Sequence, residues 1–98
     1  MIMKEKTLQA KIIKYMRSEG AWIVKYPGGA YAEVGVPDLV GCFKGRFFAF
    51  EVKVGNNYAS EMQKHQIGLI QSSGGYAFIV YSMKKVMEIV KGWKNNEI

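Results

Sequence analysis

Three charged residues of this chain have the types and the spacing of a hydrolytic site. Asp38, the sole aspartate, follows a Gly-Val-Pro run, while Glu51 and Lys53 interrupt the apolar run 47–54. Residues two positions apart on a strand share a face, so Glu51 and Lys53 should point the same way. A tight turn at 44–45 would pair the strands that carry these residues and bring Asp38 opposite Glu51.

Two carboxylates at such a distance repel each other unless a cation neutralises them. Hard oxygen ligands favour Mg²⁺ or Mn²⁺, which polarise a phosphoryl oxygen and lower the pKa of bound water. Lys53 would hold that water or stabilise the charge that develops on the phosphorus centre. The three residues therefore predict a phosphodiesterase site. The alternative is a solvated sheet face with an ordinary Glu51–Lys53 pair, which contributes little, and a turn aspartate at position 38.

The composition excludes several other chemistries. A single cysteine, Cys42, and a single histidine, His65, rule out an internal disulfide and any Cys-cluster or multi-histidine metal site. We assign His65 to a helix surface and Cys42, inside a predicted strand, to a small buried apolar position. Fourteen Lys and Arg against eight Asp and Glu give a net charge of +6, which is typical of proteins that bind nucleic acid.

The 98 residues predict one domain, 1–98, with an ordinary globular composition. No apolar run is long enough to span a membrane, and the mixed charge of residues 1–6 is unlike a signal peptide. We therefore expect a cytoplasmic protein, encoded by a phage or a bacterium.

Apolar periodicity and turn residues divide the chain into an αβββαβα order. Helices are predicted over 4–18 and 60–73 and after a capping Ser82, and strands over 22–26, 39–43, 46–54 and 76–81. The first three strands should form an antiparallel meander, and the helix before the fourth allows a parallel crossover. The expected fold is α/β (α+β), a mixed four-stranded sheet with helices on its faces.

Two short motifs resemble a known nuclease signature. Gly35-Val36-Pro37-Asp38-Leu39 followed by Phe50-Glu51-Val52-Lys53 is similar to the PD-(D/E)XK pattern. A helix that opens with Ser-x-x-Gln at 60–63 and ends at Gly74-Gly75 adds to the likeness. With these features, nearly the whole chain resembles the VRR-NUC (virus-type replication-repair nuclease) family. The resemblance implies a restriction-endonuclease-like core.

The resemblance also implies roles for individual residues. Asp38, Glu51 and the backbone carbonyl of Val52 would be metal ligands, and Lys53 would be the catalytic lysine. Glu5 matches an acidic ligand of the first helix, although a carboxylate in a first helical turn is also favoured by the helix dipole. Gln63 matches a glutamine that faces the site, although it also completes a capping box with the preceding serine. Gln9, one turn after Glu5, is a further candidate for the cleft.

The function implied by the resemblance is a Mg²⁺- or Mn²⁺-dependent DNA endonuclease acting on Holliday junctions or other branched DNA, as a homodimer. Two alternatives stay open: a catalytically silent nucleic-acid-binding module on the same fold, and a small basic protein-interaction domain. The sequence leaves open whether the Gly28-Gly29 loop contacts DNA, since it does not open a helix as a phosphate-binding loop would.

Overall fold

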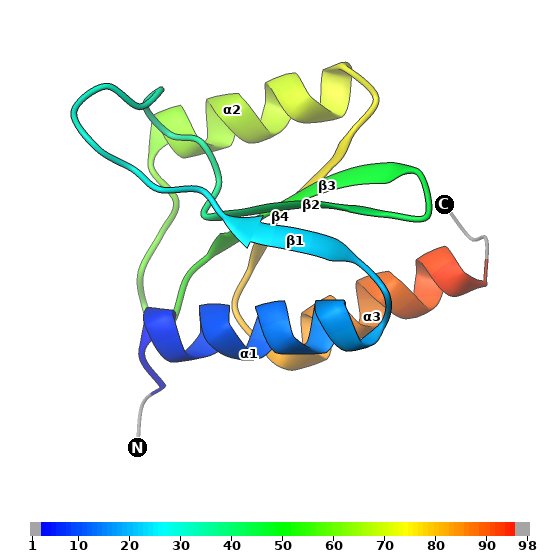
Figure 1. Cartoon of the computed structure of the whole chain (residues 1–98). Helices are drawn as coiled ribbons and strands as arrows, with labels where there is room; N and C mark the ends of the chain where they lie inside the picture. Colours follow the sequence, from blue (N-terminus) through cyan, green and yellow to red (C-terminus); the bar gives the residue numbers. More distant parts are fainter. Residues whose placement is uncertain (1–2, 96–98) are drawn as a thin grey trace.

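The computed structural model describes residues 3–95. These residues form three helices and the four strands of one sheet (Figure 1). The predicted αβββαβα order is confirmed. The elements are α1 (Glu5–Ser18), β1 (Trp22–Lys25), β2 (Leu39–Phe43), β3 (Arg46–Val52), α2 (Glu61–Ser72), β4 (Tyr76–Val80) and α3 (Met83–Lys94).

The sheet has the spatial order β1-β2-β3-β4. β1 pairs antiparallel with β2, β2 pairs antiparallel with β3, and β3 pairs parallel with β4. The predicted mixed sheet, a meander followed by one parallel crossover, is thus confirmed. β3 ends two residues earlier than predicted, because its last partner is Val80 of β4 and only one further backbone bond follows, from Lys53 N–H to the Val80 carbonyl (3.0 Å).

Helices cover the two faces of the sheet unequally. α1 and α3 lie together against one face, and α2 alone lies against the other (Figure 1). The larger core forms under α1 and α3, where alternate residues of β3, Phe48, Phe50 and Val52, are fully buried. Trp93 of α3 lies at its centre and contacts four aromatic rings, with centroids 5.6–6.4 Å away, from Phe43, Phe48, Tyr76 and Phe78.

The α2 side of the sheet is thinly covered. Its core is built on small residues, with Ala49 and Ala77 of the sheet packed against Ile67 of α2. The strand register places Trp22, Cys42 and Phe47 side by side on this face, and all three are exposed. We call these three residues the exposed row. The expectation that Cys42 is buried was therefore wrong, because Ile67 of α2 packs on Ala49 and Ala77 and not on the exposed row.

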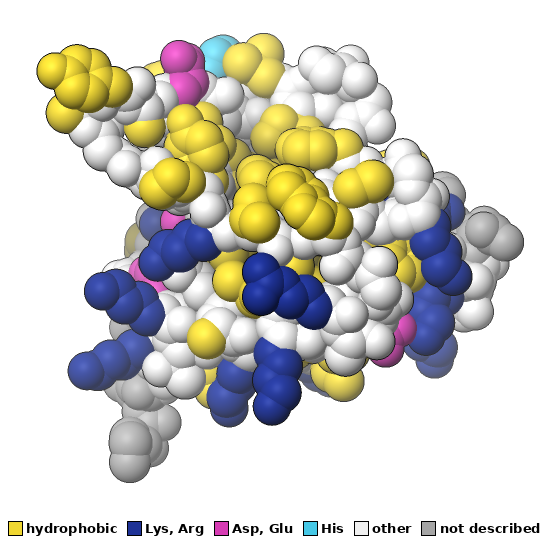
Figure 2. All heavy atoms as spheres, in the orientation of Figure 1, with side chains coloured by type: hydrophobic (Ala, Val, Ile, Leu, Met, Phe, Trp, Pro, Cys, Tyr) yellow, Lys and Arg dark blue, Asp and Glu magenta, His cyan; other side chains and the backbone are white. Residues whose placement is uncertain are grey.

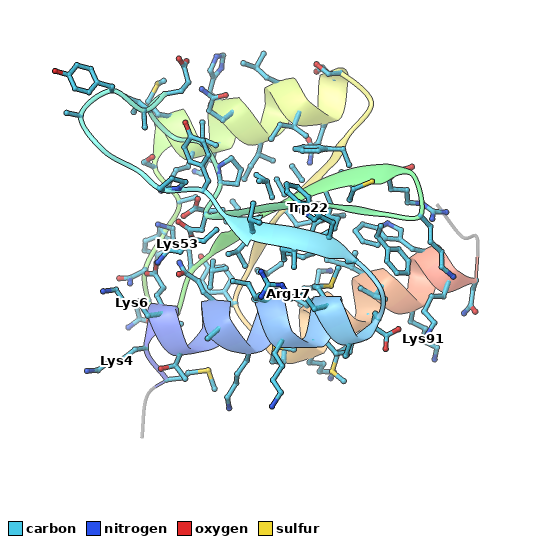
Figure 3. The ribbon with its side chains drawn as sticks, in the orientation of Figure 1. Lys4, Lys6, Arg17, Trp22, Lys53 and Lys91 are labelled. Carbon is cyan, nitrogen blue, oxygen red and sulfur yellow. The ribbon has the colours of Figure 1, made fainter. Side chains whose placement is uncertain are left out.

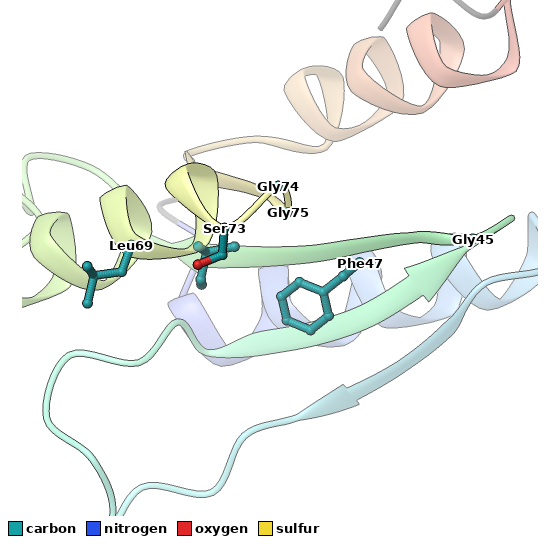
Figure 4. Close-up of a pocket in the computed structure, with 7 residues that line it drawn as sticks. Gly45, Phe47, Leu69, Ser73, Gly74 and Gly75 are labelled. Atoms are coloured by element: carbon teal, nitrogen blue, oxygen red, sulfur yellow. The ribbon is translucent and has the colours of Figure 1, made fainter.

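In Figure 2, hydrophobic side chains gather in the upper half of the view, around α2 and the sheet, while Lys and Arg side chains predominate below, over α1 and α3. Beside the exposed row, a cavity of about 440 Å³ separates Phe47 from the end of α2, where Leu69, Ser73, Gly74 and Gly75 line it (Figure 4). Within residues 3–95, no helix is long and apolar enough to cross a membrane.

The two tryptophans should differ sharply in their effect on stability. Replacing Trp93 by Ala empties the aromatic centre of the core and should lower the free energy of unfolding by about 3–5 kcal/mol. Trp22→Ala removes a side chain that is 61% exposed in the single chain and, at concentrations where the protein is monomeric, should cost less than about 1 kcal/mol. Urea unfolding followed by circular dichroism measures both values, and equal losses would contradict this description of the core.

Candidate active site

The β2–β3 hairpin brings the two predicted carboxylates together. Lys44 (φ 47°) and Gly45 (φ 85°) form the two-residue turn, which suits a tight antiparallel hairpin. From the pair Phe43–Arg46, the register runs to Leu39–Phe50. The next pair outward is Asp38 with Glu51, as predicted by counting from the turn.

Asp38 accepts two hydrogen bonds, one at its side chain and one at its backbone carbonyl. Its side-chain Oδ2 accepts a hydrogen bond from the backbone N–H of Val52 (2.9 Å), and its carbonyl accepts one from Tyr26 N–H (2.7 Å). Pro37, immediately before it, is buried and constrains the backbone that leads into β2. The Asp38 carboxylate is therefore held at the end of the sheet next to the Glu51 strand.

Glu51 is the most unusual residue of the sheet. Its side chain is 1% exposed, near the end of β3, where it pairs with Ile79 of β4. Lys53 Nζ lies 3.3 Å from Glu51 Oε2, and the Lys53 side chain is itself only 13% exposed. No described residue donates a hydrogen bond to Glu51 Oε1. A solvated sheet face with a surface ion pair, the alternative considered from the sequence, is thus excluded.

The pKa of Glu51 is raised from 4.5 to about 7, chiefly by burial of the carboxyl group and secondly by the nearby negative charge of Asp38. The positive charge of Lys53 and its hydrogen bond to Glu51 act against this rise. The ionised form of Glu51 is thus disfavoured in the protein when no cation is bound. A raised carboxyl pKa next to a second carboxylate is typical of functional sites.

This arrangement fits a divalent cation. Two carboxylates face the same small region, and one of their oxygen atoms is buried without a donor, so a cation would supply the missing charge and the missing partner. Hard oxygen donors of this kind suit Mg²⁺ or Mn²⁺. Among residues 3–95, however, no group of three or more His, Cys, Asp or Glu side chains lies close enough to hold a metal.

Glu5 is accordingly not part of a preformed three-acid cluster. It is partly buried, and its Oε2 accepts a hydrogen bond from Asn57 Nδ2 (3.4 Å), just beyond β3. Lys53 points into the space between the sheet and the start of α1, at the same end as Lys4 and Lys6 (Figure 3). Glu5 therefore starts the helix nearest the pair, and its role as a ligand stays a prediction.

Gln63 forms the capping box that was expected from the sequence, and its role at the site stays a prediction. Its Oε1 accepts a hydrogen bond from Ser60 N–H (2.8 Å), and its own N–H donates to Ser60 Oγ (3.1 Å), which is a complete capping box. It also lines a polar cavity of about 250 Å³ together with Asp38, Tyr26 and the loop 28–36. The capping box thus positions Gln63 beside the site.

Two further residues were not anticipated from the sequence. Asn57 contacts Glu5 and also accepts, through its carbonyl, a hydrogen bond from the Tyr81 hydroxyl (2.8 Å). Tyr26 lines the same cavity as Asp38. No local pattern marks these residues, because the Asn57 contacts span 52 and 24 positions of the chain. Gln9 is buried, and no described residue donates to its Oε1.

Comparison with known protein families shows to which family this chain belongs. The sequence model of the family described as archaeal Holliday junction resolvase (Hjc) matches residues 3–95. The chain belongs to the Hjc family. No curated protein sequence matches it significantly.

Solved structures show the same fold as this Hjc-family chain. Two structures described as VRR_NUC domains are similar to it, one with a TM-score of 0.76, 22% identity and coverage of 89% of this chain and 94% of that one. For the other, the TM-score is 0.74, the identity 20% and the coverages 91% and 86%. The Holliday junction resolvase Hjc of Archaeoglobus fulgidus has a TM-score of 0.63 at 17% identity, with coverages of 79% and 67%. The predicted VRR-NUC-like nuclease fold is confirmed.

The raised pKa of Glu51 predicts a distinctive effect of pH on stability. Below pH 4.5 the carboxyl is neutral in both the folded and the unfolded chain, so it has no effect. Between pH 4.5 and about 7 the unfolded chain ionises first, which destabilises the fold by up to about 3 kcal/mol. Glu51→Gln lacks this titration, so its stability relative to wild type should rise across this range and level off above it.

Chemical unfolding at several pH values, with a metal chelator present, measures this difference. Glu88→Gln, which removes an exposed carboxylate of α3, controls for the loss of one negative charge. A gap between Glu51→Gln and wild type that does not change with pH would contradict the burial of an ionisable Glu51.

Proposed function

We propose that this chain is a metal-dependent endodeoxyribonuclease that hydrolyses phosphodiester bonds at Holliday junctions or other branched DNA. The observation that carries the proposal is the buried Glu51 carboxylate, which has one unpartnered oxygen, beside Asp38 and Lys53. If the Glu51–Lys53 pair served stability alone, a second carboxylate beside it would be a disadvantage, because Asp38 raises the energy of ionised Glu51. Membership of the Hjc family supports the nuclease and its junction substrate. Such a nuclease would act in replication or repair inside the cell.

Asp38 and Glu51 would hold the divalent ion, and the Val52 carbonyl and Glu5 are the further ligands that we propose. When bound, Mg²⁺ or Mn²⁺ supplies positive charge at the phosphoryl group and favours ionisation of a water. The hydrogen bond from Val52 N–H keeps the Asp38 carboxylate in place before the ion arrives. The protein thus provides a charged and largely preorganised end of the sheet.

Lys53 would act on the reacting groups themselves. In hydrolysis, a water oxygen forms a bond to phosphorus, the bond from phosphorus to one sugar oxygen breaks, and that oxygen gains a proton. Lys53 Nζ would hold the attacking water or donate to a phosphoryl oxygen while negative charge develops there. Its ion pair with Glu51 holds the ammonium group at the same place. Gln63, fixed by its capping box at the rim of the cavity, would orient the water or the phosphate.

The remaining charge of the chain supports a polyanionic substrate. Exposed Lys and Arg side chains are concentrated on the two helices opposite α2, where they can contact phosphates with a strong dependence on salt. They are Lys6, Lys11, Lys14 and Arg17 of α1 and Lys84, Lys85, Lys91 and Lys94 of α3.

A cleavage assay tests this function directly. Labelled four-way junction, flap, single-stranded and linear duplex DNA are incubated with the protein and Mg²⁺ or Mn²⁺, and the cut products are separated on gels. Wild type should cut branched DNA, and Asp38→Asn should abolish cutting because a ligand charge is lost. Lys53→Ala should lower turnover by about 10²-fold or more while DNA affinity changes little.

Each result has a clear meaning. Wild-type rates for Asp38→Asn would contradict the assignment of the metal site. A parallel loss of affinity and turnover in Lys53→Ala would reduce Lys53 to a phosphate contact. Tight binding of junctions by wild type without any cutting would leave a silent nucleic-acid-binding module.

We also propose that the active form is a homodimer joined through the exposed row. A four-way junction needs two symmetric cuts, and each chain has one Asp38–Glu51 pair. The exposed row and the neighbouring Leu69 form an apolar, uncharged face, whereas the basic helices would repel a second copy. Two-fold pairing through this face would leave both sets of basic side chains free for DNA.

Light scattering in solution checks the homodimer. Wild type should have twice the monomer mass at micromolar concentration, and Trp22→Lys should be a folded monomer because a charge would be buried at the interface. Tyr58→Lys, at an exposed aromatic position outside the row, should remain a dimer. A strictly monomeric wild type that cuts linear duplex as well as junctions would contradict both the dimer and the junction preference.

A further inference from the structure

A loop next to the Asp38 carboxylate projects from the sheet. It joins β1 to β2, and its neck is closed by the hydrogen bond from Tyr26 N–H to the Asp38 carbonyl (2.7 Å). The loop extends outward beside the first turn of α2 (Figure 1). Loop residues 28–29 and 32–36 line the polar cavity that contains Asp38 and Gln63. A phosphate that enters this cavity to reach Asp38 would therefore lie against the loop.

The base of the loop is firmly attached to α2. Gln66 Nε2 donates to the Val34 carbonyl (3.1 Å) and approaches Glu33 Oε2 (3.5 Å). Gly35 has a positive φ of 83°, and a Cβ atom there would lie 2.5 Å from the Met62 carbonyl oxygen. Only glycine fits this contact without a shift of the backbone. The loop is thus held in one position against the helix that carries Gln63.

The tip of the loop presents an aromatic ring to solvent. Ala32 N–H donates to the Gly29 carbonyl (3.1 Å) and closes a turn, and the Tyr31 side chain beside this turn is fully exposed. A hydrophobic side chain forms the outermost point of this projection (Figure 2). Glu33 is the only charged residue from 26 to 37, so the loop is not suited to binding phosphates. An exposed ring contributes nothing to the core, yet it is a good stacking surface for a base.

We propose that Tyr31 stacks on an unstacked base at the branch point of the DNA and so gives this nuclease its preference for branched over linear DNA. The proposal rests on the function proposed above and adds the chemical group that the loop recognises. Bases inside a linear duplex are already stacked on both sides, so the ring gains little there. A branch point or a single-stranded arm offers an open base face on which the ring can stack.

The contribution is measured by binding rather than by cutting. With a chelator present, Tyr31→Ala should raise the Kd for a four-way junction by about ten-fold or more, because one base–aromatic stack is lost. Its Kd for linear duplex should stay within about two-fold of wild type. Tyr31→Phe keeps the ring and should bind junctions as wild type does.

A second measurement reports on the stack itself. A junction with 2-aminopurine at the branch point fluoresces less when that base stacks, so wild type and Tyr31→Phe should quench it and Tyr31→Ala should not. Tyr58→Ala is the matched control, because Tyr58 is 83% exposed but lies outside the loop that joins β1 to β2. It should behave as wild type in both measurements.

The proposal would be overturned by wild-type junction affinity in Tyr31→Ala, by an equal loss on linear duplex, or by an equal loss in Tyr58→Ala. These outcomes are distinct from a failure of the proposed function. If wild type binds junctions but cuts no DNA with Mg²⁺ or Mn²⁺, the nuclease assignment fails while the binding measurements still decide the role of Tyr31.

Discussion

The buried Glu51 carboxylate, placed between Asp38 and Lys53, is the constraint on which the architecture of this chain depends. An ionised acid inside a sheet costs free energy unless opposite charge lies close to it. Here the lysine two residues further along supplies part of that charge, while Asp38 on the neighbouring strand adds repulsion. Such an arrangement lowers stability in the absence of a cation, and it persists because the hairpin and the parallel β3–β4 ladder hold all three groups in place.

The helices cover the two faces of the sheet unequally. The face under α1 and α3 contains the large aromatic core around Trp93, and this core provides the stability that the charged end of the sheet lacks. The opposite face carries Glu51 at one end and the exposed row at the other, and α2 packs on Ala49 and Ala77 between them. A single helix over this face leaves a polar cavity beside Asp38 and an apolar surface at the other end.

The positively charged surface and the projecting loop lie on separate parts of the molecule. The lysine-rich helices provide attraction for phosphates without reference to base pairing, since every phosphate has the same charge. The loop between β1 and β2 is nearly uncharged, and its backbone is fixed to α2 through Gly35 and Gln66. Recognition of branched DNA would then come from the position of this loop relative to Asp38, and affinity would come from the helices.

The sequence by itself determined the order of the elements, the sheet topology and the meeting of Asp38 with Glu51, because these follow from local periodicity and from a two-residue turn that sets the register. Only the tertiary structure decided that Glu51 is buried rather than solvated, since burial depends on whether α2, ten residues further along the chain, packs over that face. It also decided that Cys42 is exposed and that Asn57 contacts Glu5. Contacts between residues far apart in the chain depend on how the helices dock on the sheet, and neither spacing nor composition records that geometry.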